Sequence, residues 1–481
     1  MPEDGTGTEI LNLGQDFPPV STATWEAAIH RDLKGADYEK RLVWRSDEGI
    51  AVRPYYRSEN LADLGAQTVS LPGEFPFVRG DGKAWKIDQD AVPTVGAIRA
   101  DLVLEAGADA IQQLGIALAS GVEKLRKLCV DRPVDVAAHE IEFVFAVGST
   151  YFFEISKLRA ARMLWARAVA AFAPTNLNSC RMNLHVRTSK LNKSYCDPYT
   201  NVLRVTTEAM SAAIGGCETL TLQPFGFEEH LALGVQRVLA EEAHLNAVAD
   251  PAGGSYYIEA LTASLAREAW KLFQRIEADG GYSQVLSAGW LAEEIAKSRA
   301  AREKAVSSRR KAMVGVNNYP DLNGKRLEIV ATPETSDAPF PLFRLAEPFE
   351  NIRRRTERQA QETGHAPKVL LLKRGDVKMR TARANFALNF FGCAGFVIAE
   401  SESDDYAGAQ ADLLILCSSD PEYLAFAQDV VSTTKIPVIV AGNPKDQIEA
   451  LKAAGVQGFV HVGSDAVETL THWQDQLGVK N

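Results

Sequence analysis

The chain has 481 residues, more than one typical domain holds, and its length predicts two domains. A hydrophobic content of 46% and a charged content of 24% are those of an ordinary globular protein. The formal net charge is −10, so no dominant basic field exists to attract phosphates. We therefore expect neither a nucleic-acid partner nor a membrane partner.

Six cysteines are scattered along the chain without the CxxC spacing of a zinc site or the pattern of a disulfide framework. This distribution predicts reduced thiols, no bound metal and a cytoplasmic location. The acidic start of the chain, from Met1 to Gly5, lacks the basic and apolar regions of a signal peptide. No apolar run approaches the length of about 18 residues that a membrane helix needs.

The first part of the chain is expected to be a flexible arm over 1–21, followed by a helix from Thr24 to Leu33. Beyond two short extended pieces and several proline-containing loops, strand-like and helix-like stretches alternate. This alternation predicts a parallel sheet with helices on its outside. The expected helices cover 97–128, 152–172, 201–214, 231–248, 260–277 and 287–311, and the expected strands cover 141–147, 180–186 and 218–222.

The periodicity is interrupted by prolines and asparagines over 313–366, which predicts a linker containing a charged helix at 349–363. Regular alternation returns over 367–481 and predicts a doubly wound sheet of five strands. Its strands are expected at 368–372, 395–399, 412–417, 436–441 and 457–462, and its helices at 378–391, 421–432 and 446–454.

Five motifs follow one another along the chain: LPGEFPFVRG at 71–80, FVFAVG at 143–148, EISKLRAAR at 154–162, DPYTNVLR at 197–204 and ADPAGGSYYIEALT at 249–262. In their residues and in their order along the chain, these motifs resemble those of the methylmalonyl-CoA mutase family. The resemblance covers roughly 22–312 and, more weakly, 366–478.

The resemblance implies a (β/α) barrel of the TIM type over 22–312 and a flavodoxin-like, cobalamin-binding-type domain over 367–481. Family members isomerise methylmalonyl-CoA and succinyl-CoA with adenosylcobalamin, in propionate metabolism, and the cofactor carries the radical chemistry. They occur as homodimers, or as heterodimers of a catalytic large subunit and a non-catalytic small one.

The family's cobalt ligand has no counterpart in this chain. In the family, a D-x-H-x-x-G loop follows the first strand of the cobalamin domain, and its histidine takes the cobalt. Here the apolar run Val369–Leu372 leads into KRGDVKMR at 373–380, with Val377 at the aspartate position and Met379 at the histidine position. A thioether is a soft, weak ligand, so we expect Met379 to pack as an ordinary side chain in a degenerate loop with Asp376.

The positions that would hold the nucleotide tail of the cofactor also differ. The family's Ser-x-Leu reads Ser418-Ser419-Asp420, and its Gly-Gly pair reads Ala441-Gly442. Asp420 would repel a phosphodiester, and Ala441 adds a Cβ where close backbone approach is needed. Ser418 and Gly442 remain weak candidates for cofactor contact, and we expect this chain not to bind adenosylcobalamin.

The barrel region departs from the catalytic members as well. After Arg79-Gly80 the family's Thr-Met-Tyr segment is replaced by DGKAWKIDQ at 81–89, which resembles the non-catalytic subunits. A full barrel needs about eight strand–helix units in about 250 residues, and the sequence offers four or five plausible strands. Either the barrel is incomplete or other segments fill it. An incomplete barrel has exposed strand edges and needs a partner or a cover.

One polar residue of the barrel is a weak catalytic candidate. His185 aligns with the histidine of the family's Thr-His-x-Gln-Thr strand, but Arg187 replaces the glutamine and Thr221 replaces the histidine of the next strand. A buried histidine with satisfied hydrogen bonds fits this setting better. No residue is assigned as catalytic with certainty, and none is assigned to the acyl-CoA.

These departures predict the non-catalytic small subunit of an adenosylcobalamin-dependent methylmalonyl-CoA mutase, which completes a heterodimer with the catalytic large subunit and stabilises it. Two alternatives remain open. The chain could be an active acyl-CoA mutase on a reduced barrel, served by the cobalamin domain of another chain. It could also be a binding module that senses acyl-CoA.

Overall fold

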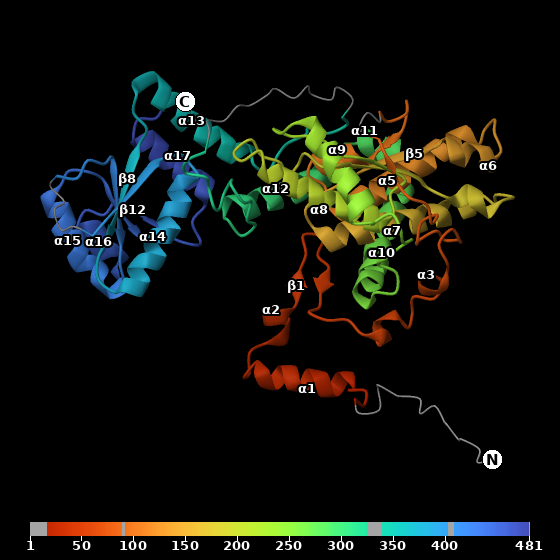
Figure 1. Ribbon diagram of the computed structural model, residues 1–481, viewed down its shortest axis with the longest axis horizontal. Helices are drawn as coiled ribbons and strands as arrows, with labels where there is room; N and C mark the ends of the chain where they lie inside the picture. Colours follow the sequence, from red (N-terminus) through yellow and green to blue (C-terminus); the bar gives the residue numbers. More distant parts are fainter. Residues whose placement is uncertain (1–16, 89–91, 325–337, 403–407, 481) are drawn as a thin grey trace, which may run out of the picture. The chain divides into compact units, whose positions relative to one another are not determined.

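The computed structural model describes residues 17–88, 92–324, 338–402 and 408–480 (Figure 1). The chain divides into two compact units, one ending at Tyr56 and the other starting at Arg57. Residues 1–16 of the expected arm and 325–337 of the expected linker lie outside the described part of the chain.

The described part of the smaller unit contains two helices and a short antiparallel strand pair. The side chain of Ser21 caps the first helix, because its Oγ accepts a hydrogen bond from the Thr24 backbone N–H at 3.1 Å. The expected helix is therefore present and begins two residues earlier than Thr24. The elements are α1 (Thr22–Asp32), α2 (Tyr38–Leu42), β1 (Trp44–Arg45) and β2 (Ala51–Val52).

The larger unit contains two parallel sheets, and the first has the strand order β3-β7-β6-β5-β4. Numbered within this sheet, the order is 1-5-4-3-2, so consecutive strands lie side by side and the first strand pairs with the last. Within the described residues β3 and β4 are not paired with each other, so the sheet is open between them. The strands are β3 (Lys86–Ile87), β4 (Ile98–Arg99), β5 (Glu142–Val147), β6 (Asn183–Thr188) and β7 (Thr219–Thr221).

Helices pack around this first sheet. Among them α5, α7 and α10 contact one another, and the ring of Phe143 on β5 lies 4.7 Å from the ring of Trp165 on α7. Both rings are buried, which anchors the helix layer to the sheet. The helices are α3 (Ala66–Val69), α4 (Ala100–Glu105), α5 (Ala110–Leu128), α6 (Val134–Ala137), α7 (Tyr151–Ala170), α8 (Thr200–Gly215), α9 (Glu229–Arg237), α10 (Tyr256–Ala278), α11 (Tyr282–Ser287) and α12 (Trp290–Ser307).

The single helix expected over 97–128 is wrong. The segment contains β4 and α4 and then breaks at Gly107, whose φ of +106° lies in the region that favours glycine. A Cβ there would lie 2.7 Å from Arg299 Cβ, so no other residue fits. The helix restarts after Asp109, whose side chain accepts a hydrogen bond from the Gln112 N–H at 2.8 Å.

The second sheet has the order β12-β11-β10-β8-β9, with all neighbours parallel. All five strands and all three helices expected after 367 are present, and one further helix, α17, follows them. The strands are β8 (Lys368–Lys373), β9 (Val397–Ser401), β10 (Leu413–Cys417), β11 (Val438–Ala441) and β12 (Gly458–Val460), and the helices are α13 (Glu347–Thr363), α14 (Val377–Gly392), α15 (Tyr423–Thr433), α16 (Ile448–Ala453) and α17 (Ala466–Gln476).

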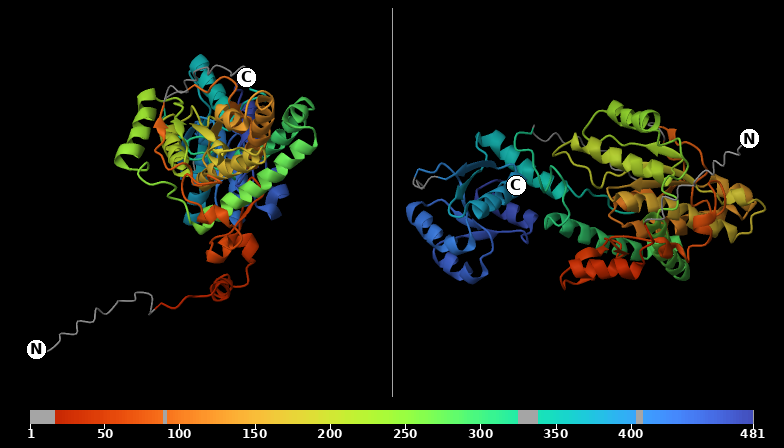
Figure 2. Two further views of the ribbon diagram at one scale, coloured as in Figure 1. Left: turned by 90° about the vertical axis from the view of Figure 1, so that its right-hand side faces the viewer. Right: turned by 60° about the horizontal axis from the view of Figure 1, so that its bottom comes forward.

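Helices cover both faces of the second sheet (Figures 1 and 2). Leu371 and Ile415 belong to one core cluster with residues of α14 and α17, whereas Leu372 and Leu416 belong to another with residues of α15 and α16. Successive residues of a strand point to opposite faces, so a strand covered on both sides is apolar throughout. This explains the continuous apolar runs of β8 and β10.

Candidate functional site

His185 lies on β6 and its side chain is buried, with 3% of its surface exposed. Its Nε2 is 2.9 Å from Thr221 Oγ1. The Thr221 hydroxyl donates its hydrogen to the carbonyl oxygen of Asp88 at 2.7 Å. A hydroxyl has one hydrogen, so the Nε2–H of His185 must be the donor in the first contact.

The other ring nitrogen of His185 faces a carboxylate. Nδ1 lies 3.4 Å from Glu142 Oε1, and the second oxygen of Glu142 accepts hydrogen bonds from the N–H and hydroxyl of Thr94. Burial lowers the pKa of His185, which favours the neutral ring. The Glu142 carboxylate opposes that shift in pKa, and the ring is held between the Thr221 hydroxyl on one side and this carboxylate on the other.

Arg187, which stands where the family has a glutamine, lies next to an existing ion pair. Its NH1 is 3.5 Å from Asp101 Oδ2, and the same carboxylate binds the guanidinium of Arg99 through both oxygens, at 2.8 and 2.7 Å. The Asp101 carboxylate therefore forms ion pairs with two guanidinium groups. It is not available as a general base.

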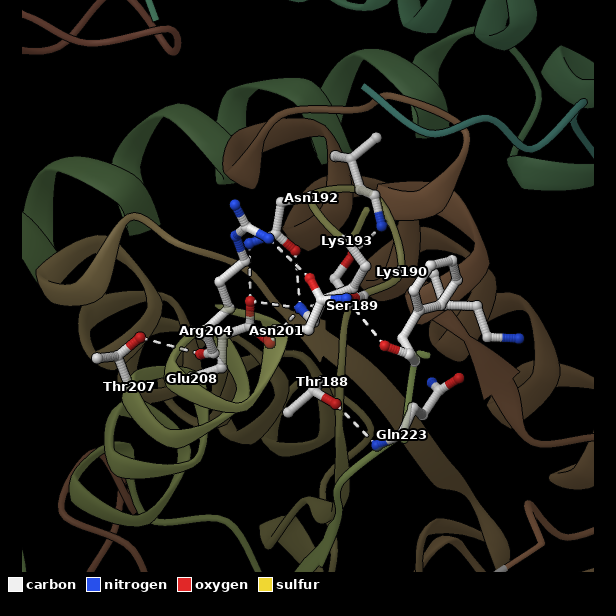
Figure 3. A network of polar contacts seen from close by, with 12 residues as sticks. Thr188, Ser189, Lys190, Asn192, Lys193, Asn201, Arg204, Thr207, Glu208 and Gln223 are labelled. Atoms are coloured by element: carbon white, nitrogen blue, oxygen red, sulfur yellow. Dashed lines mark hydrogen bonds and ion pairs between the residues drawn. The ribbon is translucent and has the colours of Figure 1, made fainter. Parts of the chain in front are cut away.

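The loop that follows β6 holds a buried polar network (Figure 3). Lys193 Nζ lies 2.7 Å from each oxygen of Glu208 on α8 and 2.8 Å from the carbonyl oxygen of Ser189. Asn192 donates to the same carboxylate at 2.8 Å. Burial lowers the pKa of Lys193 and raises that of Glu208, and each partner opposes the shift of the other.

The segment before α13 crosses this loop. The Leu345 N–H donates to the Leu191 carbonyl at 2.9 Å, and the Arg344 guanidinium lies 4.9 Å from the centre of the Tyr195 ring and 5.1 Å from that of Phe225. The same guanidinium binds both carboxylate oxygens of the fully buried Glu350, at 2.8 and 2.6 Å. The loop after β6 is therefore covered by the chain itself.

The sequence-derived candidates of the second sheet lie at its carboxyl end. Asp376 caps α14, since its Oδ1 accepts a hydrogen bond from the Met379 N–H at 2.8 Å. Met379 is half-buried on the first turn of that helix. Asp420, expected to oppose a phosphodiester, is paired with Arg383 at 3.1 Å.

Ser418 and Gly442 lie around Tyr423. The Tyr423 hydroxyl donates to the Ala441 carbonyl at 2.6 Å and accepts from the Ser418 N–H at 3.2 Å. A Cβ on Gly442 would lie 3.2 Å from the Tyr423 ring. Both candidates therefore have structural partners within the protein.

Two residues at these sheet ends escaped the sequence interpretation: Arg344 and Glu422. Arg344 stands in a proline-rich segment without periodicity, and Glu422 is one of many charged residues before a helix, so neither carried a signal.

Among the described residues, no cluster of three or more metal-binding side chains is found. None of the described helices is long and apolar enough to cross a membrane.

Comparison with known proteins identifies relatives. A sequence model of the family described as methylmalonyl-CoA mutase matches residues 89–360. The methylmalonyl-CoA mutase small subunit of Porphyromonas gingivalis is 31% identical over 98% of this chain and 100% of its own length. That of Streptomyces virginiae is 36% identical over 78% of this chain and 63% of its own length. The methylmalonyl-CoA mutase of Cereibacter sphaeroides is 40% identical over 45% of this chain and 32% of its own length.

The two parallel sheets with their helices and the matched sequence define an α/β protein of the mutase class. The chain belongs to the methylmalonyl-CoA mutase family. It spans less than two thirds of the Streptomyces virginiae relative. The alignment with the Porphyromonas gingivalis relative covers 622 positions against 481 residues, so at least 141 positions of the alignment have no counterpart in this chain.

Proposed function

We propose that this chain is the non-catalytic small subunit of an adenosylcobalamin-dependent methylmalonyl-CoA mutase of the cytoplasm. It stabilises the catalytic large subunit in a heterodimer and contributes no catalytic group. In this proposal, 22–312 is a reduced TIM-type barrel, 313–366 a linker and 367–481 a flavodoxin-like domain that has lost cobalamin.

One observation carries the proposal: the chain's own side chains lie at the carboxyl ends of β6 in the first sheet and of β8 and β10 in the second. Ligands of parallel sheets bind at those ends. Arg344 covers the loop after β6 in the first sheet, and Glu422 lies between the loops after β8 and β10 in the second. The small-subunit names of two relatives support the same interpretation.

The residues of the second sheet do not fit adenosylcobalamin. Its cobalt would need a ligand at the start of α14, where Met379 offers only a thioether. A phosphodiester at the loops after β8 and β10 would be repelled by the carboxylate of Glu422, which lies so close to Gly375 that a Cβ there would overlap it. We therefore assign no step of the reaction to this domain.

The cofactor claim is tested by titrating the purified chain with adenosylcobalamin and following the visible spectrum. The expected result is the spectrum of the free cofactor at every concentration. A spectrum in which the lower base is replaced by a protein histidine would overturn the proposal.

The partner claim is tested by coexpression with a candidate large subunit that has an intact D-x-H-x-x-G loop, followed by mass measurement of the complex. A one-to-one heterodimer with mutase activity supports the proposal. Mutase activity of the isolated chain with methylmalonyl-CoA and cofactor would favour an active reduced barrel. Binding of acyl-CoA without association with the large subunit would favour a sensing module. Either result would overturn the subunit role.

A further inference from the structure

The strand order of the second sheet reverses between β8 and β10, and the region between the loops that follow these two strands is called the β8–β10 crevice. From β8 the chain moves to β9 on one side, and it then returns across β8 to β10 on the other. The loops after β8 and β10 therefore diverge. In open parallel sheets, such a point of divergence is where ligands bind, beyond the carboxyl ends of the strands.

In this protein the side chain of Glu422 lies at that point. Its Oε2 is 2.8 Å from the Ser418 hydroxyl, 3.2 Å from the Ser419 N–H and 3.3 Å from the Asp376 N–H, and it also accepts from the Ser419 hydroxyl. Ser418 and Ser419 follow β10, whereas Asp376 follows β8. One carboxylate oxygen thus joins the two loops that form the crevice.

The capping of a helical turn explains only some of the hydrogen bonds that Glu422 accepts. Ser419 and Glu422 form a capping box at the short helical turn before α15, which accounts for the Ser419 contacts. The contacts with Asp376, 46 residues away, and with the buried Ser418 lie outside the box. The φ of +80° at Gly375 and the absence of a Cβ there leave the space that the carboxylate fills.

The electrostatic setting matches an anion. Asp376 is the N-cap of α14, so the positive end of this helix of 16 residues lies beside Glu422, although the Asp376 carboxylate already accepts the Met379 N–H of its first turn. Hydrogen bonds from Ser419 and Ser418 lower the pKa of Glu422 to about 2.

We propose that Glu422 is a built-in anionic ligand of the β8–β10 crevice and that it keeps small oxyanions, such as carboxylates and phosphates, out of it. The proposal refines the proposed function, because it names what occupies the crevice of the lost cofactor domain. Its test uses neither cobalamin nor the large subunit, so its failure is distinct from failure of the subunit role.

The experiment compares thermal unfolding of the full chain with that of Glu422→Ala and Glu422→Gln, in sodium formate and in sodium chloride of equal ionic strength. Unfolding is followed by the fluorescence of the full chain, to which Trp473, the one tryptophan of 367–481, contributes together with the six tryptophans of 25–290. Glu449→Ala is the matched control, because Glu449 is exposed on α16 and pairs with the exposed Lys452 of the same helix.

Formate is expected to raise the midpoint of Glu422→Ala by about 3 °C relative to chloride, because it occupies the vacated space, and to leave the other proteins unchanged. Glu422→Gln retains the capping box without the charge, so it is expected to unfold at a lower temperature than the unaltered chain. If Glu422→Ala does not fold in chloride, formate is expected to restore folding. A Glu422→Gln protein as stable as the unaltered chain, or the absence of a formate effect specific to Glu422→Ala, would refute the proposal.

Discussion

Lys193 and Glu208 form an ion pair that is sealed from solvent: Nζ lies 2.7 Å from both carboxylate oxygens, and the two side chains are 1% and 0% exposed. The pair joins the loop after β6 to α8, as Figure 3 shows. Removing one partner of such a pair leaves an uncompensated charge in the interior.

Lys193→Met is therefore expected to lower the free energy of unfolding by about 3–5 kcal/mol. The measurement is denaturant unfolding followed by circular dichroism. Lys271→Met, which breaks the exposed pair with Glu268, is the control and is expected to cost less than about 1 kcal/mol. The double variant Lys193→Met/Glu208→Leu should recover most of the loss, and a double variant as unstable as the single one would contradict this account.

The buried ring of His185 predicts a pH dependence of stability. Its pKa in the folded protein lies below the ordinary value of 6.5, mainly because of burial. Between the two values the unfolded chain binds the proton and the folded chain does not, so stability decreases as the pH falls below 6.5. His185→Gln should remove this part of the pH profile, measured as unfolding midpoints from pH 7 downward, whereas His230→Gln, at an exposed position of α9, should retain it.

The packing of α5 against the first sheet predicts contrasting effects of two glycine substitutions. A Cβ on Gly121 of α5 would lie 2.6 Å from the Phe143 ring and 3.1 Å from that of Trp165, so Gly121→Ala is expected to cost about 1–3 kcal/mol of stability. Gly234 of α9 has nothing within 4 Å of its Cβ position, and Gly234→Ala should stabilise the helix by about 0.5–1 kcal/mol. Equal effects of the two changes in thermal unfolding would argue against this packing.

Gly375 and Glu422 are expected to be energetically coupled. Gly375→Ala imposes a cost of about 1–2 kcal/mol because of the φ of +80°, and it adds overlap with the Glu422 carboxylate. In a Glu422→Ala background the cost of the overlap disappears, whereas the cost of the backbone conformation remains. A double-mutant cycle on unfolding free energies should therefore give a coupling above about 0.5 kcal/mol, and simple additivity would mean that the two groups do not meet.

Periodicity predicted the second sheet well. Every expected strand after 367 is present. The inner strands β10 and β11 are buried at each position and are therefore apolar throughout. In the first sheet, β3 and β4 are two residues each, too short for any period. The helix expected over 97–128 failed because the conformation at Gly107 is required by its contacts with Arg299 and Phe343, which are distant in sequence.

In the candidate sites, too, some features follow from the local sequence and others from contacts between distant residues. The sequence alone determined the alternation of strands and helices, the family motifs and the absence of a histidine at position 379, since each of these depends on neighbouring residues. Only the tertiary structure decided what fills the carboxyl ends of the sheets. Arg344 reaches Tyr195, and Glu422 reaches Asp376, through contacts between residues far apart in the chain. Folding brings these groups together, and no local pattern encodes such contacts.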